Sequence, residues 1–95
     1  MFPQKRYMTA RIDREIPPEL QLFLWQAVDR LGDDADYLQV FQLTALNSLQ
    51  QIVHTQEVPN MRRVYLFFPA DKPIAAKIYI IAEDDYATML FAEEY

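Results

Sequence analysis

The chain has 95 residues, 52% of them apolar, and its fourteen acidic and nine basic side chains give a net charge of −5. This length predicts one domain over residues 1–95 with a single two-layer core. The negative balance disfavours general binding to nucleic-acid backbones, and the absence of cysteine excludes disulfides and thiol chemistry.

Residues 6–12 alternate between polar and apolar side chains, which predicts a half-buried strand. Charge is distributed unevenly along the chain: residues 1–14 carry +3 and residues 83–95 carry −5. Opposite charges attract across neighbouring strands, and a free terminal edge invites aggregation. We therefore predict that the first strand and the last strand lie side by side.

Residues 16–32 have the clearest helical period in the chain. Six apolar residues recur at the spacing that places them on one stripe of a helix, namely Leu20, Phe23, Leu24, Ala27, Val28 and Leu31. Pro17 and Pro18 can open a helix, and Gly32, the sole glycine, stands where a left-handed residue would end it. We predict one main helix at about residues 18–31 whose stripe faces the core.

Five further strands are predicted at residues 37–43, 50–58, 63–68, 75–82 and 87–92. The polar turn at 83–86 makes residues 75–92 a β-hairpin, and the prolines of residues 69–73 indicate a loop. Residues 44–49 are open to two interpretations, a helical turn or a hairpin closed by Asn47 and Ser48.

This order of elements, β-α-β-β-β-β-β, predicts an α+β fold. The sheet is expected to be antiparallel and curved, with five to six strands, because short connections favour antiparallel neighbours. One main helix cannot cover both faces of such a sheet. The sheet must therefore curl on itself or expose its second face.

No group of residues in the sequence is typical of a catalytic or metal site. His54 is the only histidine, and we interpret it as a polar sheet residue bonded to its neighbours, in preference to a hydrolytic dyad with Ser48. The acidic clusters at residues 33–36 and 83–85 lack the spacing of a calcium loop, so we interpret them as solvated charge. We expect no cofactor, no metal and no enzymatic activity.

Aromatic side chains on a sheet can stack on nucleic-acid bases, and Tyr65, Phe67 and Tyr79 are the natural candidates here. Filling the core of a small domain explains these residues without a ligand. We prefer that interpretation, and nucleic acid is not an expected partner.

Two large side chains of the predicted helix, Leu22 and Trp25, lie outside the apolar stripe and about 60° apart on the helical wheel. Trp25 could fold over a strand end or the acidic loop. Alternatively, Leu22 and Trp25 form a small exposed ridge, and tryptophan is enriched among residues that dominate interfaces. They are our candidate interaction surface.

Five blocks of the sequence together resemble a family of roughly hundred-residue proteins of Gram-positive bacteria and their mobile elements, catalogued as a domain of unknown function. The blocks are residues 16–25, 36–41, 56–59, 76–79 and 88–95. The resemblance implies a bacterial or phage protein in the cytoplasm. It carries over no activity, cofactor or catalytic residue.

Three functions are compatible with these observations. The first is a non-enzymatic protein-interaction module that binds a protein partner or forms a homodimer through an exposed apolar patch or a sheet edge. The second is a small-molecule-binding or enzymatic domain with a pocket between helix and sheet, and the third is an acidic mobile-element inhibitor that mimics nucleic-acid charge.

The apolar runs are too short to span a bilayer, and the first residues lack the apolar segment of a signal peptide. We expect a cytoplasmic protein with no membrane contact.

Overall fold

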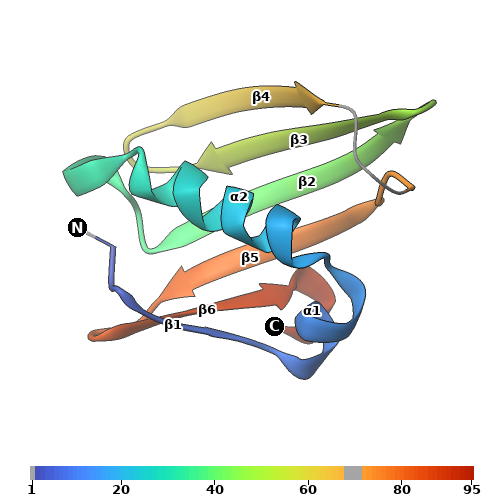
Figure 1. Cartoon of the computed structure of the whole chain (residues 1–95). Helices are drawn as coiled ribbons and strands as arrows, with labels where there is room; N and C mark the ends of the chain where they lie inside the picture. The colour runs from blue at the N-terminus through green and yellow to red at the C-terminus, as the bar shows by residue number, and fades with distance from the viewer. Residues whose placement is uncertain (1, 68–71) are drawn as a thin grey trace.

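The computed structural model describes residues 2–67 and 72–95, which form a six-stranded sheet with one main helix packed across one face (Figure 1). The helices are α1 (Ala10–Glu15), α2 (Pro18–Asp29) and the short 3-10 helices η1 (Gly32–Asp34) and η2 (Ala92–Glu94). The strands are β1 (Lys5–Met8), β2 (Leu38–Leu46), β3 (Leu49–Gln56), β4 (Met61–Phe67), β5 (Ala76–Ala82) and β6 (Tyr86–Phe91). Their order across the sheet is β1-β6-β5-β2-β3-β4.

The α+β class and the six strands agree with the sequence prediction, but a wholly antiparallel sheet was wrong. β1 runs parallel to β6, whereas the other four neighbouring pairs are antiparallel. Almost the whole chain separates β1 from β6, so no short connection fixes their relative direction. The sheet is therefore mixed, and it remains open because β1 and β4 stand at its two edges.

The predicted contact between the first and last strands is confirmed. Arg6 lies opposite Ala87 in the ladder, and Met8 lies opposite Met89. The connection continues past the ladder, since the backbone N–H of Thr9 donates to the carbonyl of Met89 at 3.1 Å.

The predicted strand at residues 6–12 was wrong beyond Met8, because α1 begins at Ala10. Thr9 is the N-cap, and its hydroxyl accepts a hydrogen bond from the backbone N–H of Ile12 at 3.2 Å. Ile12 is fully buried. The alternating pattern of this segment is equally satisfied by one helical turn with a cap and a single buried side chain.

The main helix lies where the sequence predicts it. In α2, Leu20, Leu24, Ala27 and Val28 are buried against the sheet, and Phe23 packs at the border of the same core. α2 ends at Asp29, and Gly32 follows with a left-handed backbone (φ 58°) as the first residue of η1. The strand side chains beneath the helix include Phe41, Leu43, Ile52, Ile78, Ile80 and Met89.

The open question at residues 44–49 is resolved as a hairpin. β2 runs through to Leu46, the chain turns at Asn47 and Ser48, and β3 begins at Leu49. Asn47 adopts a left-handed conformation (φ 56°), which asparagine tolerates better than most residues. Phe68, the last residue of the predicted 63–68 strand, and residues 69–71 of the predicted loop lie outside the described residues.

Candidate interaction surface

α2 packs on one face of the sheet (Figure 1), and the side chains of the opposite face point away from it. Strand side chains alternate between faces, so Val40 points away from α2 because its neighbour Phe41 is buried beneath it. In the ladder Val40 lies opposite Tyr79. We call this surface the open face. Its large side chains, of which Ile81 and Leu90 are buried, are Tyr7, Leu38, Val40, Val53, Val64, Leu66, Tyr79, Ile81, Tyr86 and Leu90.

Large parts of the open face are in contact with solvent. Tyr7 is 52% exposed, Val64 is 47% exposed and Leu66 is 57% exposed. The rings of Tyr7 and Tyr86 meet edge to face with their centroids 5.8 Å apart, and Tyr79 meets Tyr95 in the same way at 5.9 Å. The strongly exposed residues lie on the outer strands of this face, whereas Ile81 and Leu90 nearer its middle are buried. Exposed apolar residues gathered on one sheet face are typical of an interaction site.

Opposite charges flank the open face at the two ends of β5. Lys77 stands near the beginning of β5, where its ammonium lies 5.9 Å from the centre of the Tyr79 ring. The acidic turn of residues 83–85 follows the end of the same strand. The face therefore has a positive group at one end of its central strands and a negative group at the other.

A pocket of about 240 Å³ opens beside the start of β2 on the open face, lined by Asp36, Tyr37, Leu38, Val40, Thr55, Gln56 and Glu57. Asp36 accepts hydrogen bonds from two backbone N–H groups, those of Tyr37 at 2.8 Å and Val58 at 3.3 Å. These bonds orient the Asp36 carboxylate toward its own loop and toward the turn between β3 and β4. Glu57 is exposed at the rim of the pocket.

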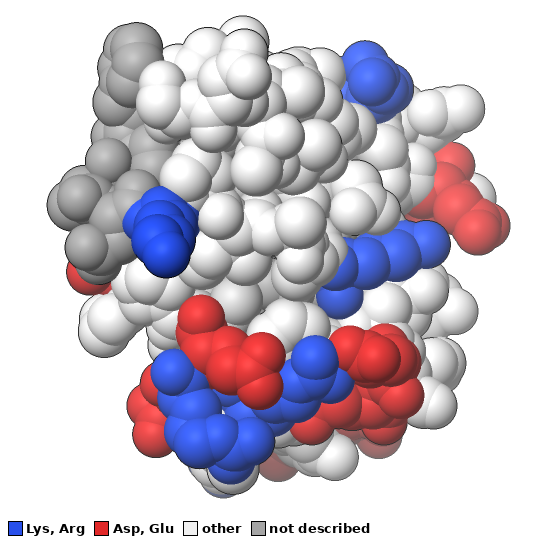
Figure 2. Space-filling model, turned by 90° about the vertical axis from the view of Figure 1, so that its right-hand side faces the viewer, with Lys and Arg blue, Asp and Glu red and all other residues white. Residues whose placement is uncertain are grey.

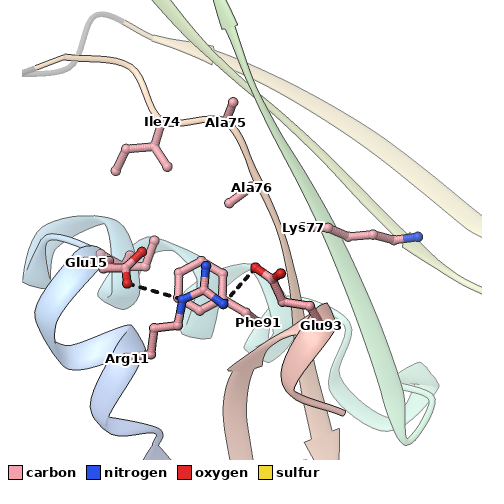
Figure 3. A pocket seen from close by; sticks show the side chains of 9 residues that line it. Arg11, Glu15, Ile74, Ala75, Ala76, Lys77, Phe91 and Glu93 are labelled. Carbon is pink, nitrogen blue, oxygen red and sulfur yellow. Dashed lines mark hydrogen bonds and ion pairs between the residues drawn. The ribbon is translucent and has the colours of Figure 1, made fainter.

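A second pocket, of about 140 Å³, lies between α1, η2 and the beginning of β5 (Figure 3). Arg11 crosses its floor: Nε donates to Oε2 of Glu15 at 3.2 Å, and Nη1 pairs with Oε1 of Glu93 at 2.7 Å. The guanidinium lies 4.0 Å from the centre of the Phe91 ring. The hydrogen bond to Glu93 makes the largest contribution to raising the pKa of Arg11, with Glu15 adding to it.

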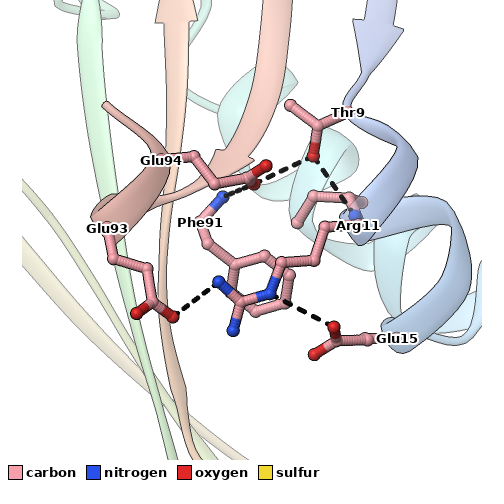
Figure 4. Close-up of polar contacts among 7 residues, drawn as sticks. Thr9, Arg11, Glu15, Phe91, Glu93 and Glu94 are labelled. Carbon is pink, nitrogen blue, oxygen red and sulfur yellow. Dashed lines mark hydrogen bonds and ion pairs between the residues drawn. The ribbon is translucent and has the colours of Figure 1, made fainter.

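The same junction is closed by a second set of polar contacts (Figure 4). Glu94 accepts hydrogen bonds from the hydroxyl of Thr9 at 2.9 Å and from the backbone N–H of Phe91 at 2.8 Å. Figure 2 shows acidic and basic side chains interleaved in one band near this end, while much of the surface beside the band is uncharged. Because its charges are paired with one another, we interpret the Arg11 pocket as the fastening of α1 to η2.

A buried polar network lies on the α2 side of the sheet. Nε2 of His54 donates to Oε1 of Gln39 at 2.7 Å, and Nε2 of Gln39 donates to Oε1 of Gln56 at 2.7 Å. Gln56 in turn donates to the carbonyls of Asp34 and Pro59, both at 2.9 Å. The network ties β2 and β3 to the loops at one end of the sheet.

His54 is fully buried, and its ring stacks on Phe41 with the centroids 4.2 Å apart. Burial lowers the pKa of His54 to about 4, and the positive charge of Arg63 adds to this effect. Nδ1 of His54 has no hydrogen-bond partner among the described residues. The imidazole is therefore neutral at physiological pH and carries its proton on Nε2.

The structure separates the two residues of the candidate ridge on α2. Leu22 is 58% exposed, whereas Trp25 is half-buried and packs at the border of the core. The guanidinium of Arg6 lies 4.8 Å from the centre of the Trp25 ring and forms a two-pronged ion pair with Asp29. The role of Leu22 and Trp25 as an interaction surface stays a prediction.

The aromatic candidates for base stacking are divided between the two faces of the sheet. Tyr65 and Phe67 pack around Phe23 on the α2 side, with ring centroids 5.0 Å and 5.6 Å from that of Phe23. Tyr79 lies on the open face, so the three rings form no common platform.

The polar candidates also lie apart. Ser48 is at the exposed hairpin tip, whereas His54 is in the core about 20 Å further along β3. Within residues 2–67 and 72–95, no group of three acidic or histidine side chains is arranged to hold a metal ion.

Sequence reasoning missed the open face as a specific surface and the glutamine network as a core feature. The signal for the open face was present, because residues 38–43 and 50–56 alternate so that one set had to face away from the helix. No signal marked the network, since glutamines at strand positions are usually solvated.

The fold defines an α+β protein with a six-stranded mixed sheet packed on one face by a main helix. The family model described as "Staphylococcal protein of unknown function (DUF960)" matches residues 5–94, so the chain belongs to that family, as the resemblance of the sequence blocks indicated. A solved structure described as a protein of unknown function from Enterococcus faecalis shares this fold, with a TM-score of 0.79 and 18% identity. The similarity covers 96% of this chain and 90% of that chain. The comparison with curated proteins found no match. Among the described residues, no helix is long and apolar enough to cross a membrane.

Proposed function

We propose that the chain is a non-enzymatic protein-interaction module that forms a homodimer by packing its open face on that of a second copy. The observation that carries the proposal is the sheet face opposite α2, on which Tyr7, Val64 and Leu66 are about half exposed. Two sheets that pack face to face bury their apolar side chains in a shared layer about 10 Å thick. Val64 and Leu66, each about half exposed, would gain the burial that the isolated chain does not give them.

The size of the face supports a stable contact. The molecule measures 38 × 28 × 21 Å along its principal axes, and six strands about 4.8 Å apart span about 24 Å of it. A standard protein interface buries about 800 Å² of each partner, which a face of these dimensions can supply.

The charges of the open face favour a second copy as its occupant. A twofold axis that runs across the strands places β5 on β5 with the strand direction reversed. Lys77 of each copy then faces the acidic turn of residues 83–85 of the other copy. In this dimer two contacts between opposite charges flank an apolar centre. The charge pattern therefore favours it over the dimer in which the β5 strands run in the same direction and the two acidic turns meet.

The test compares two lysine substitutions on opposite sides of the molecule. Val40→Lys places a charge at the centre of the open face, and Leu22→Lys places the same charge on the exposed side of α2. Molar mass in solution is measured by sedimentation equilibrium, and folding is checked by thermal unfolding. We expect the parent and Leu22→Lys to be dimers and Val40→Lys to be a folded monomer.

A charge swap tests the orientation without touching the apolar centre. Lys77→Glu should raise the dimer dissociation constant about tenfold, and adding Asp84→Lys to the same chain should restore it. Dissociation by Leu22→Lys with Val40→Lys still dimeric would contradict the proposal and would identify the α2 ridge as the interface. Failure of the second charge to rescue the first would exclude the proposed orientation.

A further inference from the structure

One edge of the sheet carries a strand whose outer side is unpaired. β4 pairs with β3 from Met61 to Phe67, and no other described strand pairs with it (Figure 1). In an antiparallel ladder, alternate residues turn their N–H and C=O groups away from the partner strand. β4 is seven residues long, whereas the strand at the opposite edge, β1, has four. β4 is therefore the longer template for a further strand.

The charge of β4 differs from that of the chain. β4 contains Arg62 and Arg63 and no acid, in a protein of net charge −5. Both arginines are exposed, and neither forms an ion pair with any residue of the described parts of the chain. Arginines on an edge repel a second copy of the same edge, and they attract a strand of opposite charge.

We propose that β4 binds an acidic, extended segment of a partner protein, which adds to the sheet as a seventh strand. This inference rests on the proposed function in that both describe an interaction module, but it uses a different surface. The backbone ladder supplies affinity for an extended chain, and the side chains of β4 select its sequence.

The side chains of β4 specify the order of residues in the bound segment. Arg62 and Arg63 occupy the beginning of β4, and Val64 to Phe67 occupy the remainder. In a segment antiparallel to β4, the N-terminal residue lies opposite Phe67 and the C-terminal residues lie opposite the arginines. The fitting segment therefore has apolar residues followed by two adjacent acids, one facing Arg62 on the open face and the other facing Arg63 on the α2 side.

The probe is a synthetic peptide of about eight residues, an ordinary strand length, with alternating valine and threonine followed by two glutamates. Binding is measured by fluorescence anisotropy, and the site is located from amide chemical shifts of isotopically labelled protein. We expect saturable binding that shifts the amides of β4. Arg62→Glu combined with Arg63→Glu should weaken binding about tenfold, and this variant should prefer the matching peptide with two lysines.

The matched control is Arg14→Glu combined with Arg30→Glu. It makes the same change in net charge on α1 and directly after α2, and it should bind the acidic peptide as the parent does. Equal binding by the β4 variant, or shifts confined to other elements, would overturn the proposal. So would an absence of binding to the parent. Sedimentation of the Val40→Lys variant tests the open face alone, and peptide binding tests β4 alone. A failure of the dimer proposal is therefore distinguished from a failure of the β4 proposal.

Discussion

Nε2 of His54 donates a hydrogen bond to Oε1 of Gln39 at 2.7 Å, and both side chains are fully buried. An amide oxygen can only accept, so this contact fixes the tautomer of the imidazole. Burial, with the positive charge of Arg63 adding to it, lowers the pKa of His54 to about 4 and keeps the imidazole neutral.

The first prediction concerns the pH dependence of stability. The pKa of His54 is lowered to about 4 from an unfolded value of 6.5, so the unfolded state binds a proton more readily than the folded state. The stability that neutral His54 contributes is fully present above pH 6.5 and is lost as the pH falls toward 4. From about pH 7.5 to about pH 5.5, this group alone should lower the free energy of unfolding by about 1.3 kcal/mol.

Urea unfolding at the two pH values measures this difference, and His54→Gln is the control because its amide can still donate to Gln39 without titrating. The free energy of unfolding of the parent minus that of His54→Gln should decrease as the pH falls. A parallel dependence in both proteins would show that His54 is not its source.

The second prediction concerns the buried glutamine network. Gln39→Leu removes the acceptor of His54 and the donor to Gln56, so buried polar atoms lose their partners. The free energy of unfolding should fall by about 2–3 kcal/mol. Chemical denaturation at neutral pH measures it, with Gln26→Leu on the exposed side of α2 as control. A loss below 0.5 kcal/mol, the usual range for a surface change, would mean that the network does not stabilise the core.

The third prediction concerns Gly32. A Cβ atom at this position would meet no atom within 4 Å, so the cost of a side chain is conformational and not steric. With φ at 58°, Gly32→Ala should destabilise the protein by about 1 kcal/mol, and Gly32→Asn by less. Thermal unfolding of the two variants tests this order. A larger loss in the asparagine variant would contradict it.

The sequence was sufficient to predict the features that depend on periodicity. The stripe from Leu20 to Val28 located α2. The opposite charges of the chain ends predicted β1 beside β6, but the β1–β6 ladder pairs no opposite charges, and Arg11 and Glu93 pair between α1 and η2 instead. The parallel direction of that pair was missed because strand direction leaves no mark in side-chain alternation. α1 was missed because the capping hydroxyl of Thr9 and the burial of Ile12 act within a single turn.

Tertiary contacts determine the remainder. Trp25 was identified as lying outside the apolar stripe, but its contact with Arg6 joins α2 to β1 across 19 positions of the sequence. The buried state of Gln39 and Gln56 likewise depends on loop carbonyls that only the folded chain brings within reach. Local patterns cannot specify such partners.

The central claim is that the open face packs on a second copy of the chain. The most direct test is sedimentation equilibrium of the unmodified protein at neutral pH over about a hundredfold range of concentration. The homodimer predicts a molar mass that rises with concentration to twice the 11.3 kDa of the single chain. A mass of 11.3 kDa at every concentration would contradict it.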